Sequence, residues 1–165
     1  MKTLYLLRHA KSDWDDDEIS DADRPISKRG KKDCQLIANE LQRSEHHFSH
    51  VYCSPARRAQ DTLKRFQACA NVFDSAEIVH ESAIYTFEAE ELQSWLKELP
   101  QSIERALLIG HNPALADLAN YLYDGKIGHI GTCTFIELEI NIEYWDQLRA
   151  DSAKLSGIIR PKQFR

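Results

Sequence analysis

The stretch Thr3-Leu4-Tyr5-Leu6-Leu7-Arg8-His9-Ala10 is a short apolar run that ends in an arginine and a histidine. A second apolar run, Ala106-Leu107-Leu108-Ile109-Gly110, is followed directly by His111. Short unbroken apolar runs bounded by polar residues are typical of buried strands. Because ligands of open α/β sheets bind at the carboxyl ends of the strands, we expect the two histidines to share one site. Arg8 adds a planar charge suited to bidentate recognition of phosphate or carboxylate.

The length, charge and cysteine content of the chain exclude several classes of protein. Its 165 residues fit a single domain, residues 1–165, that buries its own core. A formal charge of −5 argues against general nucleic-acid binding, which calls for a basic face. The four cysteines are far apart and form no Cys-x-x-Cys pair, so we expect reduced thiols. No apolar stretch approaches the ~20 residues that span a bilayer. With no pattern of a secretion signal at the N-terminus, we expect a cytoplasmic protein without a membrane partner.

Strand and helix patterns alternate along the chain, which predicts an α/β fold with a mostly parallel sheet covered on both faces. The expected strands are Thr3–Leu7, Val51–Cys53, Ile78–Val79, Ala106–Ile109 and Thr134–Ile140. The expected helices are Lys28–Leu41, capped by Ser27, and Arg57–Ala68, Glu90–Leu99 and Pro113–Leu122. The polar segment Ser12–Asp23 is expected to be a surface loop beside His9.

Two junctions between a strand and a helix are expected to favour anions. In Ser54-Pro55 and in Asn112-Pro113 a capping residue precedes a proline, which suits the first position of a helix. Exposed amides at such helix starts attract negative charge. The first junction leads into Arg57 and Arg58. We therefore expect three loops to converge on one anionic group.

These residue types fit phosphoryl transfer to histidine. A neutral imidazole can attack phosphorus in line and form a phosphohistidine, which water then hydrolyses. The transferred group spreads its charge over three oxygens, so catalysis consists mainly of positioning and electrostatic stabilisation. Arginines and a second, preferably protonated, histidine can supply that stabilisation without a metal or another cofactor. A carboxylic acid can protonate the leaving atom.

Four ordered motifs carry a family resemblance over nearly the whole chain. They are Leu7-Arg8-His9-Ala10-Lys11-Ser12, Asp23-Arg24-Pro25-Ile26-Ser27-Lys28-Arg29-Gly30, Ser54-Pro55-Ala56-Arg57-Arg58-Ala59-Gln60-Asp61-Thr62 and Ile109-Gly110-His111-Asn112-Pro113. In this order they resemble the motifs of the histidine phosphatase superfamily, which also contains the phosphoglycerate mutases. Many members have glycine where this chain has Ala10, and alanine there is similar to the SixA-like phosphohistidine phosphatase subgroup. The resemblance implies a three-layer α/β/α sandwich of the phosphoglycerate mutase-like type.

The resemblance also implies roles for individual residues. His9 corresponds to the phosphorylated nucleophile, and Arg8, Arg58 and His111 to the rest of the pocket. The Ser-Pro-x-x-Arg-Ala pattern selects Arg58, which leaves Arg57 as a surface charge.

Two further groups of residues are candidates for the site, one for substrate binding and one for the general acid. Lys11 and Arg24 are additional candidates for substrate binding. In larger relatives a glutamate downstream of the third strand protonates the leaving oxygen, and Glu81 is the nearest candidate here. Asp13 and Asp21 on the first loop are the alternatives.

We therefore predict a metal-independent phosphatase whose substrate is phosphohistidine on a protein, such as a histidine-containing phosphotransfer protein or another phosphorelay component. The chain lacks the long insertions that cap small-substrate pockets in larger relatives, and a P–N bond needs little acid assistance to break. The alternatives are a small-molecule phosphomonoesterase or mutase, and a phosphate- or phosphoprotein-binding module without turnover. We interpret His46, His47 and His50 as solvated surface rather than as a metal site. The sequence does not determine an oligomeric state.

Overall fold

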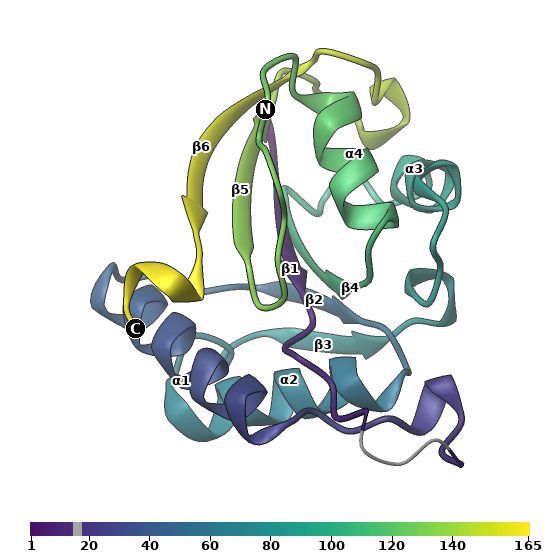
Figure 1. The fold of residues 1–165 in the computed structure, drawn as a ribbon. Helices are drawn as coiled ribbons and strands as arrows, with labels where there is room; N and C mark the ends of the chain where they lie inside the picture. The colour runs from purple at the N-terminus through teal and green to yellow at the C-terminus, as the bar shows by residue number, and fades with distance from the viewer. Residues whose placement is uncertain (15–17) are drawn as a thin grey trace.

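Six strands form one sheet in the order β3-β2-β4-β1-β5-β6 in the computed structural model, which describes residues 1–14 and 18–165 (Figure 1). The strands are β1 (Lys2–Arg8), β2 (His50–Cys53), β3 (Glu77–His80), β4 (Arg105–Gly110), β5 (Phe135–Ile140) and β6 (Ala153–Ile159). β1, β2, β3 and β4 pair in parallel, whereas β5 is antiparallel to both of its neighbours. The mostly parallel sheet predicted from the sequence is confirmed.

Helices cover both faces of this sheet and give the predicted three layers. They are α1 (Lys28–Arg43), α2 (Arg57–Cys69), α3 (Ala89–Lys97) and α4 (Ala114–Leu122). Short 3-10 turns add η1 (Asp21–Asp23), η2 (Ser82–Ile84), η3 (Trp145–Gln147) and η4 (Pro161–Gln163). α1 and α2 pack on one face, and α3 and α4 pack on the other (Figure 1). Among the described residues, none of the helices combines the length and apolarity needed to cross a membrane.

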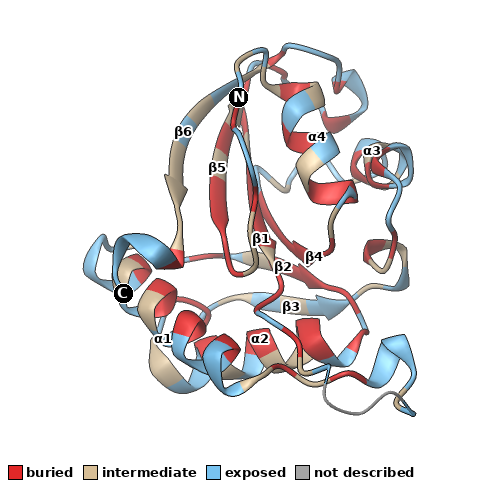
Figure 2. Cartoon of the chain, in the orientation of Figure 1, coloured by how far each residue is buried: buried red, intermediate tan, exposed pale blue. Residues whose placement is uncertain are grey.

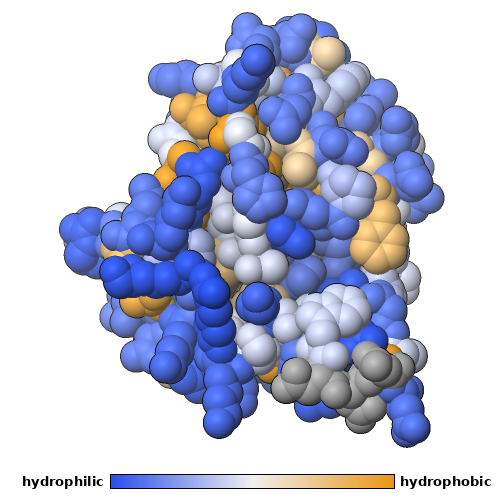
Figure 3. Space-filling model, in the orientation of Figure 1, coloured by the Kyte–Doolittle hydropathy of each residue, from blue (hydrophilic) through white to orange (hydrophobic). Residues whose placement is uncertain are grey.

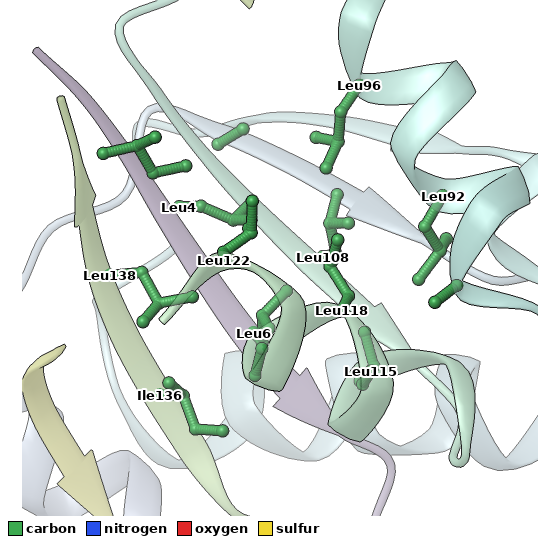
Figure 4. Packing of buried hydrophobic residues seen from close by; sticks show 14 of the residues in the cluster. Leu4, Leu6, Leu92, Leu96, Leu108, Leu115, Leu118, Leu122, Ile136 and Leu138 are labelled. Atoms are coloured by element: carbon green, nitrogen blue, oxygen red, sulfur yellow. The ribbon is translucent and has the colours of Figure 1, made fainter. Parts of the chain in front are cut away.

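Strand β1 is apolar along its length because both of its faces are buried. Successive side chains of a strand point to opposite faces. Leu4 and Leu6 join the cluster under α3 and α4, whereas Tyr5 and Leu7 join the cluster under α1 and α2. Figure 4 shows the first cluster, in which leucines of β1 meet those of α3, α4 and β4. The central strands are accordingly buried throughout, while the outer surfaces of the helices are exposed (Figure 2).

All of the predicted strands and helices are present, with bounds that differ by a few residues. Ser27 caps α1 as predicted, since its hydroxyl accepts a hydrogen bond from the Gly30 amide at 3.1 Å. Strand β6 was not predicted, because this edge strand is only partly buried and lacks a continuous apolar run.

The proline junctions differ from the prediction. α2 begins at Arg57 behind Ala56, and α4 begins at Ala114 behind Pro113, so neither proline occupies the first helical position. The hydroxyl of Ser54 forms a hydrogen bond with His111 in the site described below. The Asn112 side chain still accepts a hydrogen bond from the Ala116 amide at 3.3 Å.

The chain connections place a crevice at the carboxyl ends of β1 and β4. These strands are neighbours in the sheet, but the helix that follows β1 lies on one face and the helix that follows β4 lies on the other. Such a switch point leaves an opening above the strand ends, where ligands bind. The His9 amide donates to the Gly110 carbonyl at 3.1 Å, so the two strands remain paired up to the edge of the crevice. The predicted polar loop lies beside it, although its residues 15–17 fall outside the described residues.

Candidate active site

His9 lies at the end of β1 with one ring nitrogen fixed by a backbone carbonyl and the other carrying a lone pair that faces Arg58. Nδ1 lies 2.7 Å from the carbonyl oxygen of Ala10. Because a carbonyl only accepts, Nδ1 carries the hydrogen and Nε2 carries a lone pair. Burial, assisted by the charges of Arg58 and Arg8, lowers the pKa of His9 to about 4. The ring is therefore a neutral imidazole with an available Nε2 over the physiological pH range.

Arg58 holds its guanidinium against this nitrogen. Its Nε lies 3.4 Å from His9 Nε2, and its side chain is buried. The other two nitrogens donate to Asp21, one to the carboxylate at 3.1 Å and one to the backbone carbonyl at 2.7 Å. The hydroxyl of Tyr85 donates to the same carboxylate oxygen. Arg58 is thus fixed in position by an acidic residue contributed by the first loop.

The loop of His9 is tied directly to the first turns of α2. The Ala10 amide donates to the hydroxyl of Thr62 at 2.9 Å, and that hydroxyl donates to the carbonyl of Arg58 at 2.7 Å. On its other side the loop lies against α1 at Gly30, where a Cβ atom would lie 2.5 Å from the Lys11 carbonyl oxygen. This close approach requires glycine, which explains its place in the second motif.

His111 lies opposite His9, with 5.2 Å between the ring centroids, and is fully buried. Its Nε2 lies 2.7 Å from the hydroxyl of Ser54, which also accepts from the Ala56 amide. The hydroxyl has one hydrogen to donate, and when it donates that hydrogen to Nε2 the neutral ring carries its own hydrogen on Nδ1. That atom is buried and has no hydrogen-bond partner among the described residues. Such an atom is a donor available to an incoming oxyanion.

The charge of His111 differs from the sequence-based expectation. We expected a protonated second histidine, but burial and the neighbouring His9 and Arg58 lower its pKa to about 3. His111 is therefore neutral over the physiological pH range. A negatively charged group beside it would raise this pKa, since an opposite charge favours the protonated form.

Arg8 completes the set of predicted residues. Its Nη1 donates to the Ile130 carbonyl at 3.0 Å, and its Nε is buried with no hydrogen-bond partner among the described residues. Burial and the nearby charge of Arg58 lower its pKa. Together with His9, Arg58 and His111, Arg8 lines a pocket of ≈ 390 Å³ at the crevice, which we call the catalytic pocket. The structure therefore brings these four predicted residues together.

The structure separates the two adjacent arginines as the motif predicted. Arg58 lies in the catalytic pocket, whereas Arg57 is exposed and pairs with Asp61 at 3.6 Å on the outside of α2. Lys11 lines the catalytic pocket. Arg24 is not among the residues that line the catalytic pocket. Its guanidinium lies 3.9 Å from the ring centroid of Trp14, which does line the pocket.

The candidate acids fall in different places. The carboxylate of Glu81 accepts a hydrogen bond from the Trp95 indole at 2.7 Å, and Glu81 is not among the residues that line the catalytic pocket. Asp21 does line it and is the one carboxylate among the described lining residues. Hydrogen bonds from Tyr85 and Arg58 lower the pKa of Asp21 despite its partial burial. The geometry therefore favours the sequence alternative Asp21 over Glu81, but as an ionised group.

Three contributors to the site were missed at the sequence level. The rings of Tyr85 and Phe87 lie against His111, with centroids at 5.1 and 5.8 Å, and Ser54 was interpreted only as a cap. Tyr85 and Phe87 follow η2 in an irregular segment, where no periodicity or motif marks them. The histidines set aside as surface residues lie elsewhere: His46 contacts Glu137 at 3.1 Å and His50 contacts Glu77 at 3.8 Å.

Comparison with known proteins agrees with this arrangement. The family described as "Histidine phosphatase superfamily (branch 1)" matches residues 4–115. The chain therefore belongs to the histidine phosphatase superfamily. Within that superfamily it is SixA-like: it is 28% identical to the phosphohistidine phosphatase SixA of Escherichia coli over 124 residues, which are 74% of this chain and 75% of that protein.

Two further relatives extend the match to the whole chain. An uncharacterized chloroplastic protein of Arabidopsis thaliana is 31% identical over 171 residues, covering 97% of this chain and 78% of that protein. The solved structure of the protein histidine phosphatase SixA complexed with tungstate superposes with a TM-score of 0.79 at 21% identity, covering 99% of each chain. The fold is therefore the one that the resemblance implied.

Proposed function

We propose that this protein is a phosphatase that forms a phosphohistidine at His9 and that its substrate is phosphohistidine on a protein. The observation that carries the proposal is the hydrogen bond from His9 Nδ1 to the Ala10 carbonyl, which directs the lone pair of Nε2 into a pocket lined by cationic side chains. A nucleophile fixed in this tautomer needs no general base.

The chemistry follows in two displacements. His9 Nε2 attacks phosphorus and a new N–P bond forms, while the bond to the leaving nitrogen breaks and its electron pair stays on that nitrogen. A substrate ring that carries a proton on its other nitrogen leaves as neutral imidazole, so no acid on the enzyme is needed. Water then attacks the phosphohistidine, the electron pair of the N–P bond returns to His9 Nε2, one proton of the water passes to solvent, and inorganic phosphate leaves. In both steps the charge on the phosphoryl oxygens is met by Arg8, Arg58 and the Nδ1 hydrogen of His111.

The ionisation state of Asp21 supports a substrate in which a P–N bond is broken. Asp21 is held ionised by Arg58 and Tyr85, so it is a weak proton donor. A phosphate ester needs its alkoxide to be protonated, whereas an imidazole leaves with little assistance. Glu81, engaged by Trp95, does not supply the missing proton in this geometry.

The rim of the catalytic pocket supports a protein substrate. Trp14 and Phe87 line the pocket, and their side chains are 59% and 45% exposed. Exposed aromatic residues around a recessed polar site are common at protein interfaces. An open rim of this kind can accept a histidine side chain that projects from a folded partner.

One pair of measurements tests the proposal. After rapid quench from a radiolabelled phosphoryl donor, we expect an acid-labile, alkali-stable phosphoenzyme that is absent in His9→Ala. Labelling that survives in His9→Ala and disappears in His111→Ala would reverse the two roles.

The second measurement compares kcat/KM for a phosphohistidine protein with kcat/KM for p-nitrophenyl phosphate and for a sugar phosphate. We expect the phosphohistidine protein to be hydrolysed best. Equal or greater efficiency on the sugar phosphate would contradict the protein substrate and leave the His9 mechanism intact. The absence of turnover on every substrate, with intact phosphate binding, would instead favour a binding module.

A further inference from the structure

A second cavity, of ≈ 430 Å³, adjoins the catalytic pocket. Arg8 and Thr132 line both, so the two cavities are neighbours that share these two side chains. The second cavity is also lined by Arg29 of α1 and by the C-terminal residues Arg160, Lys162 and Arg165. We call it the basic cavity.

The basic cavity concentrates positive charge in a chain whose formal charge is −5. Its described lining residues include five arginine and lysine side chains and no aspartate or glutamate. One of the five is neutralised: Arg165 donates to the buried carboxylate of Asp33 at 2.8 and 3.2 Å. Like charges gathered in one concave site repel one another and create a positive potential that attracts anions.

Two of the cations, Arg160 and Arg8, are held in place by neutral groups rather than by acids. Arg160 donates to the Ile127 carbonyl at 2.9 Å, and Arg8 donates to the Ile130 carbonyl at 3.0 Å. Backbone carbonyls orient a guanidinium without cancelling its charge, so Arg160 and Arg8 keep a fixed positive charge that can attract an anion. Figure 3 shows the same surface, where strongly hydrophilic side chains gather over the C-terminal segment and the start of α1.

We propose that the basic cavity is a subsite for a second anionic group, carboxylate or phosphate, on the same substrate molecule as the scissile phosphoryl group. The proposal rests on the proposed function for the group that occupies the catalytic pocket. With the phosphoryl group at His9, Arg8 lies between the two anions and contacts both. On a protein substrate the second group is an acidic side chain near the phosphohistidine, and on a small substrate it is a second phosphate.

The test uses a double variant outside the catalytic pocket, Arg29→Gln with Lys162→Gln. Both side chains are exposed, line the basic cavity and are not among the residues that line the catalytic pocket. The matched control is Lys64→Gln with Lys97→Gln, which removes two exposed charges from other surfaces, on α2 and α3. Two substrate pairs are compared: a phosphohistidine peptide flanked by glutamates or by glutamines, and a sugar bisphosphate or its monophosphate.

We expect the double variant to lose about tenfold in kcat/KM on the doubly anionic member of one pair, with the other member and the control within about twofold. A loss on the glutamate peptide identifies a carboxylate of a protein, and a loss on the bisphosphate identifies a second phosphate. Equal kcat/KM for wild type and double variant on all four substrates would overturn the subsite.

A binding arm separates failure of the subsite from failure of the proposed function. In the His9→Ala background, the unphosphorylated glutamate peptide and inorganic pyrophosphate are titrated by calorimetry. We expect at least one of them to bind severalfold more weakly when Arg29→Gln and Lys162→Gln are added. If the wild type turns over no phosphohistidine substrate but this difference persists, the proposed function fails and the anion subsite stands. Identical titrations in both backgrounds would overturn the subsite whatever the turnover.

Discussion

The catalytic pocket and the basic cavity share Arg8 but are built in opposite ways. In the catalytic pocket His9, Arg58 and His111 are buried, and each is fixed by a hydrogen bond with a neighbouring loop. In the basic cavity Arg29 and Lys162 are exposed and extend from the surface of a helix and of a terminal turn. The difference teaches that the groups around His9 are buried and fixed in position, whereas the basic cavity presents exposed charges that can act through their field.

The largest expected effect separates two neighbouring arginines of α2. Arg58→Ala removes a buried charge-assisted contact to the transferred group, so we expect a loss of about a hundredfold or more in kcat/KM. Arg57→Ala, the matched control on the exposed side of the helix, is expected to retain nearly full activity. The reverse ranking would mean that the surface charge rather than the buried one contacts the phosphoryl group.

The second prediction concerns the proton on His9. With its pKa lowered to about 4 from an ordinary value of ~6.5, the ring binds a proton about two orders of magnitude more weakly than a free imidazole. The neutral form is present above the lowered pKa, so it predominates down to about pH 5 and is lost as the pH falls through about 4. Nitrogen NMR of the ligand-free protein, assigned with His9→Ala, should show a neutral ring with its hydrogen on Nδ1 at pH 6. A ring that titrates near 6.5 would contradict the desolvated pocket.

A smaller loss of activity is expected when one of the hydrogen bonds that position Asp21 beside Arg58 is removed. Tyr85→Phe removes the hydroxyl that bonds Asp21 and keeps the ring that packs on His111. Because Asp21 remains bonded to Arg58, we expect a loss in kcat of about threefold to tenfold with KM little changed. Tyr144→Phe, an exposed tyrosine beyond the site, is the control. A loss as large as that of Arg58→Ala would make the Tyr85 hydroxyl a direct participant in the reaction.

The smallest expected effect is the response of kcat/KM to salt, which should distinguish the exposed basic cavity from the buried catalytic pocket. Raising the ionic strength from about 0.05 M to about 0.5 M shortens the screening length below the span of an exposed charge contact. We expect kcat/KM to fall severalfold for the glutamate-flanked phosphohistidine peptide and to stay within about twofold for its glutamine counterpart. Equal salt sensitivity of the two peptides would show that the exposed cations contribute no selective field.

Much of the fold followed from local patterns. Buried parallel strands leave short apolar runs in the sequence, so β1 and β4 were predicted within a residue or two of their ends. Amphipathic helices leave a period of about 3.6 residues, which located α1 and α2 equally well. Edge strand β6 was missed because none of its residues is fully buried, so its alternation of apolar and polar residues is weak.

The residues of the site likewise divide into those that local patterns predicted and those that they did not. Arg8, His9, Arg58 and His111 were predicted because each stands beside a strand end or within an ordered motif. Tyr85, by contrast, contacts His111 and Asp21 only because η2 lies against β4, a contact between segments that no local pattern encodes.

The sequence by itself determined the order of the strands and helices, the two histidine-bearing strand ends and the family to which the chain belongs, because each depends on residues close together along the chain. Only the tertiary structure decided the tautomer of His9, the neutral state of His111, the preference for Asp21 over Glu81 and the existence of the basic cavity. These properties depend on burial and on distances between residues far apart in the sequence, such as Arg58 and Asp21 or Arg8 and Lys162. Desolvation and charge proximity arise only when the chain is folded, so no local pattern can encode them.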